Sequence, residues 1–374
     1  MGRGSPDPRL SRRAVAAVLL LLAAGGCVAV GAGSATTANP EPFITVADRL
    51  TTAIRERRPG DFIANFAPDE AGRRMGLQWY SVLAPAGALV TADGDHRLRV
   101  TWTLPGDRRA ARSTLAASWT TSGGRTVIAG VSQQVGAPLW TLQASRLTSA
   151  ASGTLVSAAS SDADRDAWST RLDRAADEVR AAEILPESSD FSGGLVIEAP
   201  ADPGDFQTMS GVPAAEAGAV AVCSTGTPRI VVNPMLSAAG EDAVAATLTH
   251  EAVHVATDSP CVAASRTIPW VVEGLAESVA AQSHPAVAET NRQSVATYVK
   301  EHGVPDDLPV SLSSQTEYAL AQLAIDQVRA HWTRDQAADF FDRAIHDSPM
   351  VTDVELAQAR RWYRTELERI ATSV

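Results

Sequence analysis

The sequence is poor in positive charge. Its 374 residues include 32 Lys and Arg, of which only Lys300 is a lysine, against 43 Asp and Glu, so the formal net charge is −11 at pH 7. A surface of this sign repels a phosphate backbone, and the chain has no basic segment with interleaved aromatic residues, which argues against nucleic acid as a partner. The charged fraction of 20% and the hydrophobic fraction of 45% are those of a folded globular protein.

Cysteine is also scarce. The three cysteines are Cys27, which belongs to the N-terminal segment, and the pair Cys223 and Cys261. In an oxidising compartment such a pair is expected to form a disulfide, and here it would staple the segments that flank residues 250–254. The alternative is two buried free thiols.

Residues 1–26 have the layout of a bacterial export signal. A leader with four arginines precedes an apolar run at 14–24, and Gly25-Gly26-Cys27 follows. Cys27 after two small residues resembles a lipobox, in which the cysteine is lipidated and becomes the mature N-terminus. The alternative is an uncleaved anchor, because the apolar stretch can be extended through Val30.

Other features of this N-terminal region agree with export. Arg12-Arg13 also allows a twin-arginine signal, although the residues after it fit that pattern poorly. Residues 27–42 are small and polar and are expected to form a flexible tether. Each alternative places the protein outside the cytoplasm, at the outer face of the cell membrane.

Residues 43–150 are predicted to form helices followed by an antiparallel sheet. Apolar residues recur at helical spacing up to residue 83, with an interruption at Pro59-Gly60, and then alternate with polar residues at 96–104 and twice more downstream. This order predicts an α+β domain and resembles a cone-shaped NTF2-like domain. The likeness is one of architecture and carries no function.

Residues 151–374 are predicted to form a second domain, a small mixed sheet followed by a helical half. Residues 151–162 form either a linker or a first strand. The further strands and helices are predicted at 163–184 (helix), 194–198, 219–223 and 229–232 (strands), and 240–257, 269 onward, 286–302, 315–332, 334–347 and 353–371 (helices). One interpretation of 219–223 or 229–233 is a sheet edge to which an extended peptide could add as a strand, and the alternative is an ordinary interior strand.

The motif that carries chemistry is His250-Glu251-Ala252-Val253-His254. Two histidines at i and i+4 lie on one face of a helix and can bind one zinc ion, with the glutamate between them placed to act as a base. An apolar stripe that includes Leu248 and Val255 indicates that this helix is buried on one side. Two buried histidines beside a carboxylate would be unfavourable without a partner such as a metal ion.

A zinc hydrolase needs three protein ligands and one open position. Glu273 is expected to be the third ligand, on a helix that begins at Pro269. Glu277 lies one turn further along the same face and can hydrogen-bond a ligand histidine and fix its tautomer, or exchange roles with Glu273. Tyr318 and His331, on later helices, are candidates for stabilising an oxyanion.

With these residues, the sequence resembles the gluzincin metallopeptidases, specifically the peptidase MA-like proteins exported by actinobacteria. The resemblance covers about 154–347 and rests on the HExxH motif, the Trp-x-x-Glu-Gly-Leu-Ala-Glu segment, the stretch 229–234 and Tyr318. It implies that His250, His254 and Glu273 bind one zinc ion per chain and that Glu251 is the general base. A small mixed sheet followed by helices is also the scaffold expected of a zincin-like domain, and the two-part layout of the chain is similar to that group.

The sequence departs from the family in two places. It has no Gly-x-Met-x-Asn exopeptidase motif, although the eighteen residues between His254 and Glu273 match the spacing of the aminopeptidase branch, so aminopeptidase specificity is not implied. The segment 258–267 has no family role.

The function expected from the sequence is therefore that of a membrane-anchored, extracytoplasmic zinc metallopeptidase that hydrolyses peptide bonds of a peptide or protein substrate. The alternative is a cell-surface binding or assembly protein in which the zincin site is degenerate or structural. The sequence does not encode the identity of the substrate.

Overall fold

The computed structural model describes residues 43–373 except 95, 159–160, 186–190, 193 and 311. The predicted export signal, Cys27 and the predicted tether lie outside the described residues. Within those residues the chain combines helices with two sheets, so the α+β class predicted from the sequence is confirmed. No helix in this part of the chain is both long enough and apolar enough to cross a membrane.

The first sheet is antiparallel throughout and has the order β1-β2-β3-β4. Its strands are β1 (Leu89–Ala92), β2 (Arg97–Trp102), β3 (Ala111–Ser122) and β4 (Arg125–Val131), and the helices before it are α1 (Phe43–Arg55), α2 (Pro59–Ile63) and α3 (Glu70–Leu83). In β2, Leu98, Val100 and Trp102 are buried while the residues between them are more exposed, as the alternation predicts. Pro59 begins α2 after α1 has ended at Arg55, and in this first turn its missing N–H is no loss.

The second sheet is mixed and has the order β5-β6-β7-β9-β8. Its strands are β5 (Ser145–Ala150), β6 (Gly153–Ala158), β7 (Leu195–Ala199), β8 (Ala219–Val222) and β9 (Arg229–Val232). The inner strands β6, β7 and β9 are parallel, and β5 and β8 pair antiparallel at the two edges. The predicted domain boundary at 150 therefore falls in the turn between two paired strands, and 151–162 contains a strand rather than only a linker.

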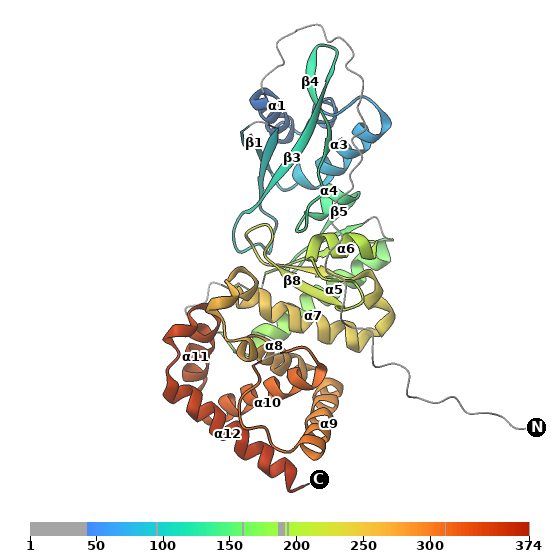
Figure 1. Cartoon of the computed structure of the whole chain (residues 1–374). Helices are drawn as coiled ribbons and strands as arrows, with labels where there is room; N and C mark the ends of the chain where they lie inside the picture. Colours follow the sequence, from blue (N-terminus) through green and yellow to red (C-terminus); the bar gives the residue numbers. More distant parts are fainter. Residues whose placement is uncertain are drawn as a thin grey trace, which may run out of the picture. The chain divides into compact units, whose positions relative to one another are not determined.

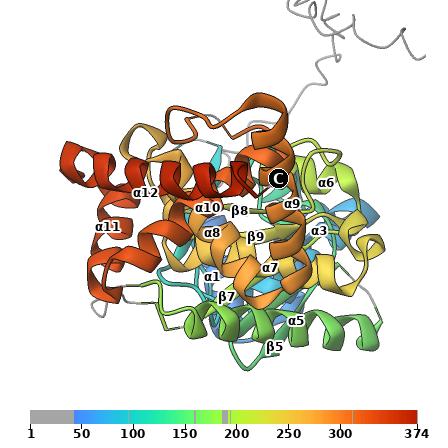
Figure 2. The ribbon, with the colours of Figure 1, turned by 90° about the horizontal axis from the view of Figure 1, so that it is seen from below.

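Helices cover this sheet and form most of the described residues that follow it. The α-helices are α4 (Leu139–Leu142), α5 (Asp162–Ala181), α6 (Pro203–Ser210), α7 (Glu241–Ala256), α8 (Pro269–Ser283), α9 (Pro285–His302), α10 (Gln315–His331), α11 (Arg334–His346) and α12 (Asp353–Ala371). Short 3-10 helices are η1 (Pro234–Ala239), η2 (Ser259–Cys261), η3 (Ala264–Arg266) and η4 (Ser348–Met350). Figure 1 shows α8 among α7, α10 and α11, and Figure 2 shows α7 and α8 in front of the strands of the second sheet.

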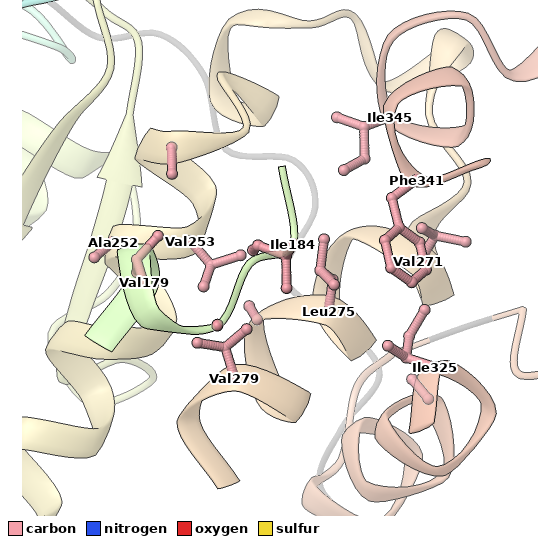
Figure 3. Close-up of a cluster of buried hydrophobic side chains, with 14 of the residues drawn as sticks. Val179, Ile184, Ala252, Val253, Val271, Leu275, Val279, Ile325, Phe341 and Ile345 are labelled. Carbon is pink, nitrogen blue, oxygen red and sulfur yellow. The ribbon is translucent and has the colours of Figure 1, made fainter. Parts of the chain in front are cut away.

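Helix α8 is the centre of the larger hydrophobic core. Val271, Leu275 and Val279 point from α8 toward side chains of α5, α7, α10 and α11 (Figure 3). Gly274 allows α8 to approach α10 closely, because a Cβ atom there would lie 2.5 Å from the carbonyl oxygen of Ala321. This packing fixes the helix that carries Glu273 and Glu277 against the helix that carries Tyr318.

A buried ion cluster ties the β2–β3 loop to the second sheet. The guanidinium of Arg229, on β9, donates to Asp107 at 2.7 and 3.0 Å and to Glu198, on β7, at 2.7 Å. Only 3% of the Arg229 side chain is exposed, against 0% for Asp107 and 5% for Glu198. The guanidinium also lies 5.2 Å from the centre of the Trp102 ring. The cluster holds one cation and two carboxylates in a dry environment, so each group depends on the others.

Candidate metal centre

Helix α7 carries three of the predicted site residues. Its apolar residues Val244, Leu248, Ala252 and Val255 are almost completely buried in the larger core. Because these residues occupy one side of the helix, His250 and His254 share another side one turn apart. Glu251 and His254 are themselves buried, with 9% and 7% of each residue exposed.

The structure brings the imidazoles of α7 to the carboxylate of Glu273 on α8. The Nε2 atoms of His250 and His254 lie 3.1 Å apart, and they lie 3.3 and 3.4 Å, respectively, from Oε2 of Glu273. These three residues form a group that could hold a metal ion. The three atoms thus make an almost equilateral triangle.

The distances between the three atoms of the triangle are close to those between the ligands of a zinc ion. In a tetrahedral site, nitrogen and oxygen ligands lie about 2.0–2.2 Å from the ion, which places the ligand atoms about 3.3–3.6 Å from one another. The two separations to Glu273, 3.3 and 3.4 Å, lie in that range, and the separation of 3.1 Å between the two imidazoles is slightly shorter. Two imidazoles and one carboxylate are also a ligand set that catalytic zinc accepts, with the fourth position left for water or substrate. The residues present therefore fit a zinc ion.

The other ring nitrogens of the two histidines have partners behind the triangle. Nδ1 of His254 lies 3.2 Å from the hydroxyl of Ser259, and Nδ1 of His250 lies 3.9 Å from Oε1 of Glu277. A hydrogen-bond partner such as Ser259 orients a ligand imidazole and favours one tautomer. Glu277 lies on the far side of the His250 ring from Glu273, but 3.9 Å is too long for the hydrogen bond that the sequence predicted.

Reasoning from the sequence missed Asn291, which supports Glu277. Asn291, on α9, is only 2% exposed and donates its amide to Glu277 at 3.3 Å and to Gln322 at 2.7 Å, while it accepts from Gln315 at 2.9 Å. The side chain links α8, α9 and α10 behind His250. No local signal marks this asparagine, because its partners come from helices distant in sequence.

The triangle lies in an open cleft of about 410 Å³. The edge strand β8 forms one wall with Ala219, Val220 and Ala221, and Tyr318 from α10 lines it as well. The backbone N–H of Ala221 donates to Oε2 of Glu251 at 2.7 Å. Of the two strands that the sequence left open, β8 is the edge beside the site and β9 is an interior strand.

A disulfide and two arginines brace the end of α7. Cys223, just after β8, is bonded to Cys261 in η2, with the two Cα atoms 5.1 Å apart. Arg108 donates to the carbonyl oxygen of Ala256 at the C-terminus of α7, at 2.9 Å, where a cation is favourable. Arg109 makes two hydrogen bonds to Asp258, at 3.0 and 3.1 Å. These contacts give the segment 258–267, unassigned from sequence, a role in holding Ser259 beside His254.

The two oxyanion candidates have different surroundings. The ring of Tyr318 lies 6.4 Å from that of His250, in the wall of the cleft. Burial, and then the charge of Glu273, raises the pKa of the Tyr318 hydroxyl to about 12, so that it remains a hydrogen-bond donor at neutral pH. His331 instead stacks on Trp362 at 4.6 Å and bonds the carbonyl oxygen of Gln327. It does not line the cleft, so the suggestion that it serves the site is wrong.

Burial and opposite charges shift the pKa values in the triangle. Burial alone would lower the pKa of His250, but the hydrogen bond to Glu273 and the charge of Glu251 raise it to about 9. Burial raises the pKa of Glu251 above its ordinary value. Burial alone would raise the pKa of Glu273, but the charges and hydrogen bonds of His254 and His250 hold that pKa well below its usual range.

These shifts predict proton release on metal binding. His250 with a pKa of about 9 is protonated at pH 7 in the ion-free protein, whereas a metal ligand must be neutral. Zinc is therefore expected to displace about one proton, and its apparent affinity should rise by up to about tenfold per pH unit until pH 9. Calorimetry of the chelator-treated protein at pH 7, in two buffers of different ionisation enthalpy, measures this release. His302→Gln, on the exposed face of α9, should not change it, and binding without proton release would contradict the assignment.

Comparison with known proteins adds no relative, because no family model, no curated protein and no solved structure matches the chain. The functional interpretation therefore depends on the geometry of the cleft and on the sequence motif.

Proposed function

We propose that this chain is an exported zinc-dependent metallopeptidase of the gluzincin, peptidase MA-like type. The observation that carries the proposal is the triangle of His250, His254 and Glu273, whose atoms are spaced like zinc ligands at the floor of a cleft. In this proposal the second sheet and its helices are the zincin-like domain. The first sheet with α1 to α3 is the NTF2-like domain.

The residues of the cleft have distinct roles in peptide hydrolysis. A zinc ion held by the triangle would supply Lewis acidity, which polarises a carbonyl group and acidifies water. Glu251, with its raised pKa, accepts a proton from water and returns it to the leaving amine. Tyr318 keeps its proton and can donate a hydrogen bond to the oxyanion. Ser259 holds the imidazole of His254 in position, and the carboxylate of Glu277 faces Nδ1 of His250.

The edge strand suggests how substrate is held. Strand β8 pairs with β9 on one side only, so its other side is open to an extended peptide except at the N–H of Ala221, which donates to Glu251. A peptide that adds there would have its backbone aligned along the wall of the cleft, next to Glu251. Strand addition uses mainly hydrogen bonds to the peptide backbone, which agrees with a peptide or protein as the substrate.

The N-terminal segment supplies the proposed location. The export signal at 1–26, with Cys27 as a lipidation site or with the apolar run as an anchor, would hold the enzyme at the outer face of the cell membrane. The disulfide between Cys223 and Cys261 agrees with an oxidising compartment.

One contact favours a second candidate function. The hydrogen bond from Ala221 to Glu251, at 2.7 Å, gives the glutamate a structural partner in the edge strand. In a cell-surface binding protein, Glu251 could keep that contact while the metal cluster served only to hold α7 and α8 together. The two candidates differ in whether the protein turns over peptides.

A peptide library tests the proposal. The purified protein with one equivalent of zinc is expected to cleave internal peptide bonds in a library of mixed sequence. A chelator should abolish the cleavage, and zinc should restore it. Mass spectrometry of the products identifies the cleaved bonds. A protein that binds zinc but leaves the whole library intact would support the binding-protein alternative and contradict the peptidase proposal.

A further inference from the structure

A second cleft lies at the carboxyl ends of the parallel strands, away from the metal centre. It encloses about 420 Å³, a volume typical of small-molecule sites, and Ala158, Ala199 and Val232 line it where β6, β7 and β9 end. Trp168 and Arg171, from the first half of α5, form the opposite wall. None of the residues of the metal triangle lines this cleft.

The cleft contains a buried hydroxyl group without a partner. Ser157, on β6, is 2% exposed, and its Oγ atom has no hydrogen-bond partner in the described part of the chain. Successive residues of a strand point to opposite faces, so Ser157 shares the face of Leu155, which packs with Leu172 of α5. The hydroxyl therefore points toward the α5 side, where the cleft lies. A buried hydroxyl is normally hydrogen-bonded, which indicates that a ligand or water completes this one.

Arg171 supplies a second polar group that a ligand could bind. Its Nε and Nη2 atoms donate to Glu241 at 2.5 to 3.1 Å, and its guanidinium lies 4.7 Å from the centre of the Trp168 ring. Nη1 has no partner among the described residues. At the rim, Asp164 accepts from the N–H and the hydroxyl of Ser161 through Oδ2, which leaves Oδ1 as an acceptor. The cleft thus offers donors and acceptors together.

The charges around the cleft favour neither an anion nor a cation. Glu241 neutralises Arg171, and Asp164 adds a negative charge, so an anion finds no net positive field in a protein whose net charge is −11. A cation would have to approach the guanidinium of Arg171. An extended peptide cannot add as a strand, because β6, β7 and β9 are each paired on both sides.

We propose that this cleft binds a neutral saccharide. The hydroxyl groups of a sugar both donate and accept, which satisfies Ser157, Arg171 Nη1 and Asp164 at once. The C–H faces of its ring would pack against Trp168 and Pro200. The site is independent of the metal centre and of the peptidase activity.

The test uses the purified protein with glucose, galactose, N-acetylglucosamine, maltose and cellobiose, each screened by saturation-transfer NMR. Calorimetry then gives the Kd of the strongest binder. Ser157→Ala is expected to weaken this binding about tenfold, the effect of one lost hydrogen bond in a dry site. Its unfolding temperature should not fall, because the hydroxyl makes no bond within the described chain. Arg171→Met should also weaken binding, while Ser294→Ala, an exposed serine on α9, should leave the Kd unchanged.

Three results would overturn the proposal. The first is that none of the five sugars gives saturation transfer. The second is that Ser157→Ala and Arg171→Met bind the sugar as tightly as the wild type does. The third is that an uncharged probe, N-acetylalanine amide, binds in a manner that depends on Ser157 while the sugars do not, which would make the cleft an amide site.

Discussion

Glu251→Gln is expected to lower peptidase activity about 10²- to 10⁴-fold while zinc remains bound. Glutamine keeps the size of the side chain and can still accept the hydrogen bond from Ala221, so the helix and the edge strand should remain in place. It cannot take a proton from water, and the zinc ligands His250, His254 and Glu273 are unchanged. The rate at which the variant cleaves a peptide substrate measures the loss of activity, and its zinc content shows whether the metal remains bound.

The matched control is Glu289→Gln, an exposed glutamate on α9 whose partners are Arg292 and Gln293. This variant should retain the wild-type rate. If Glu251→Gln with bound zinc cleaved as fast as the wild type, the assigned base would be wrong, whatever the metal content.

Arg229→Met is expected to destabilise the fold by about 3–5 kcal/mol. The substitution leaves Asp107 and Glu198 buried without their cation, since these carboxylates are 0% and 5% exposed. A methionine fills much of the volume, so the effect reports mainly the loss of charge pairing. The free energy of unfolding in a denaturant titration measures it.

Arg180→Met provides the comparison on the surface. Arg180 pairs with Asp177 on α5, where both side chains are exposed, and such pairs contribute roughly 0–1 kcal/mol. A similarly small change for Arg229→Met would show that the ion cluster does not hold the β2–β3 loop to the second sheet.

Most helices could be predicted from the sequence because their apolar residues repeat clearly. The predicted helix at 240–257 corresponds to α7 (Glu241–Ala256), and that at 353–371 coincides with α12. Strands whose residues are buried on both faces give no alternation, so β6, with all six residues buried, could not be distinguished from a linker. Its partner β5 and the short helix α6 went unpredicted for want of a periodic pattern.

The residues of the candidate site likewise fall into those that the sequence could predict and those that it could not. His250, Glu251 and His254 are set by one helix, and Glu273 follows in a motif of its own, so these residues could be named from the sequence. Residues whose role depends on tertiary contacts could not: Ser259 and Asn291 meet the ligand histidine and Glu277 only because separate helices pack together. Sequence spacing also placed His331 on a late helix near Tyr318, but it could not show which face of α10 meets the cleft.

The zinc content of the purified protein tests the central claim most directly. Elemental analysis after dialysis against metal-free buffer is expected to give about one zinc ion per chain, and His250→Ala, which removes one corner of the triangle, should contain almost none. Wild-type protein without near-stoichiometric zinc, or a His250→Ala variant that retains it, would contradict the assignment of His250, His254 and Glu273 as a metal centre.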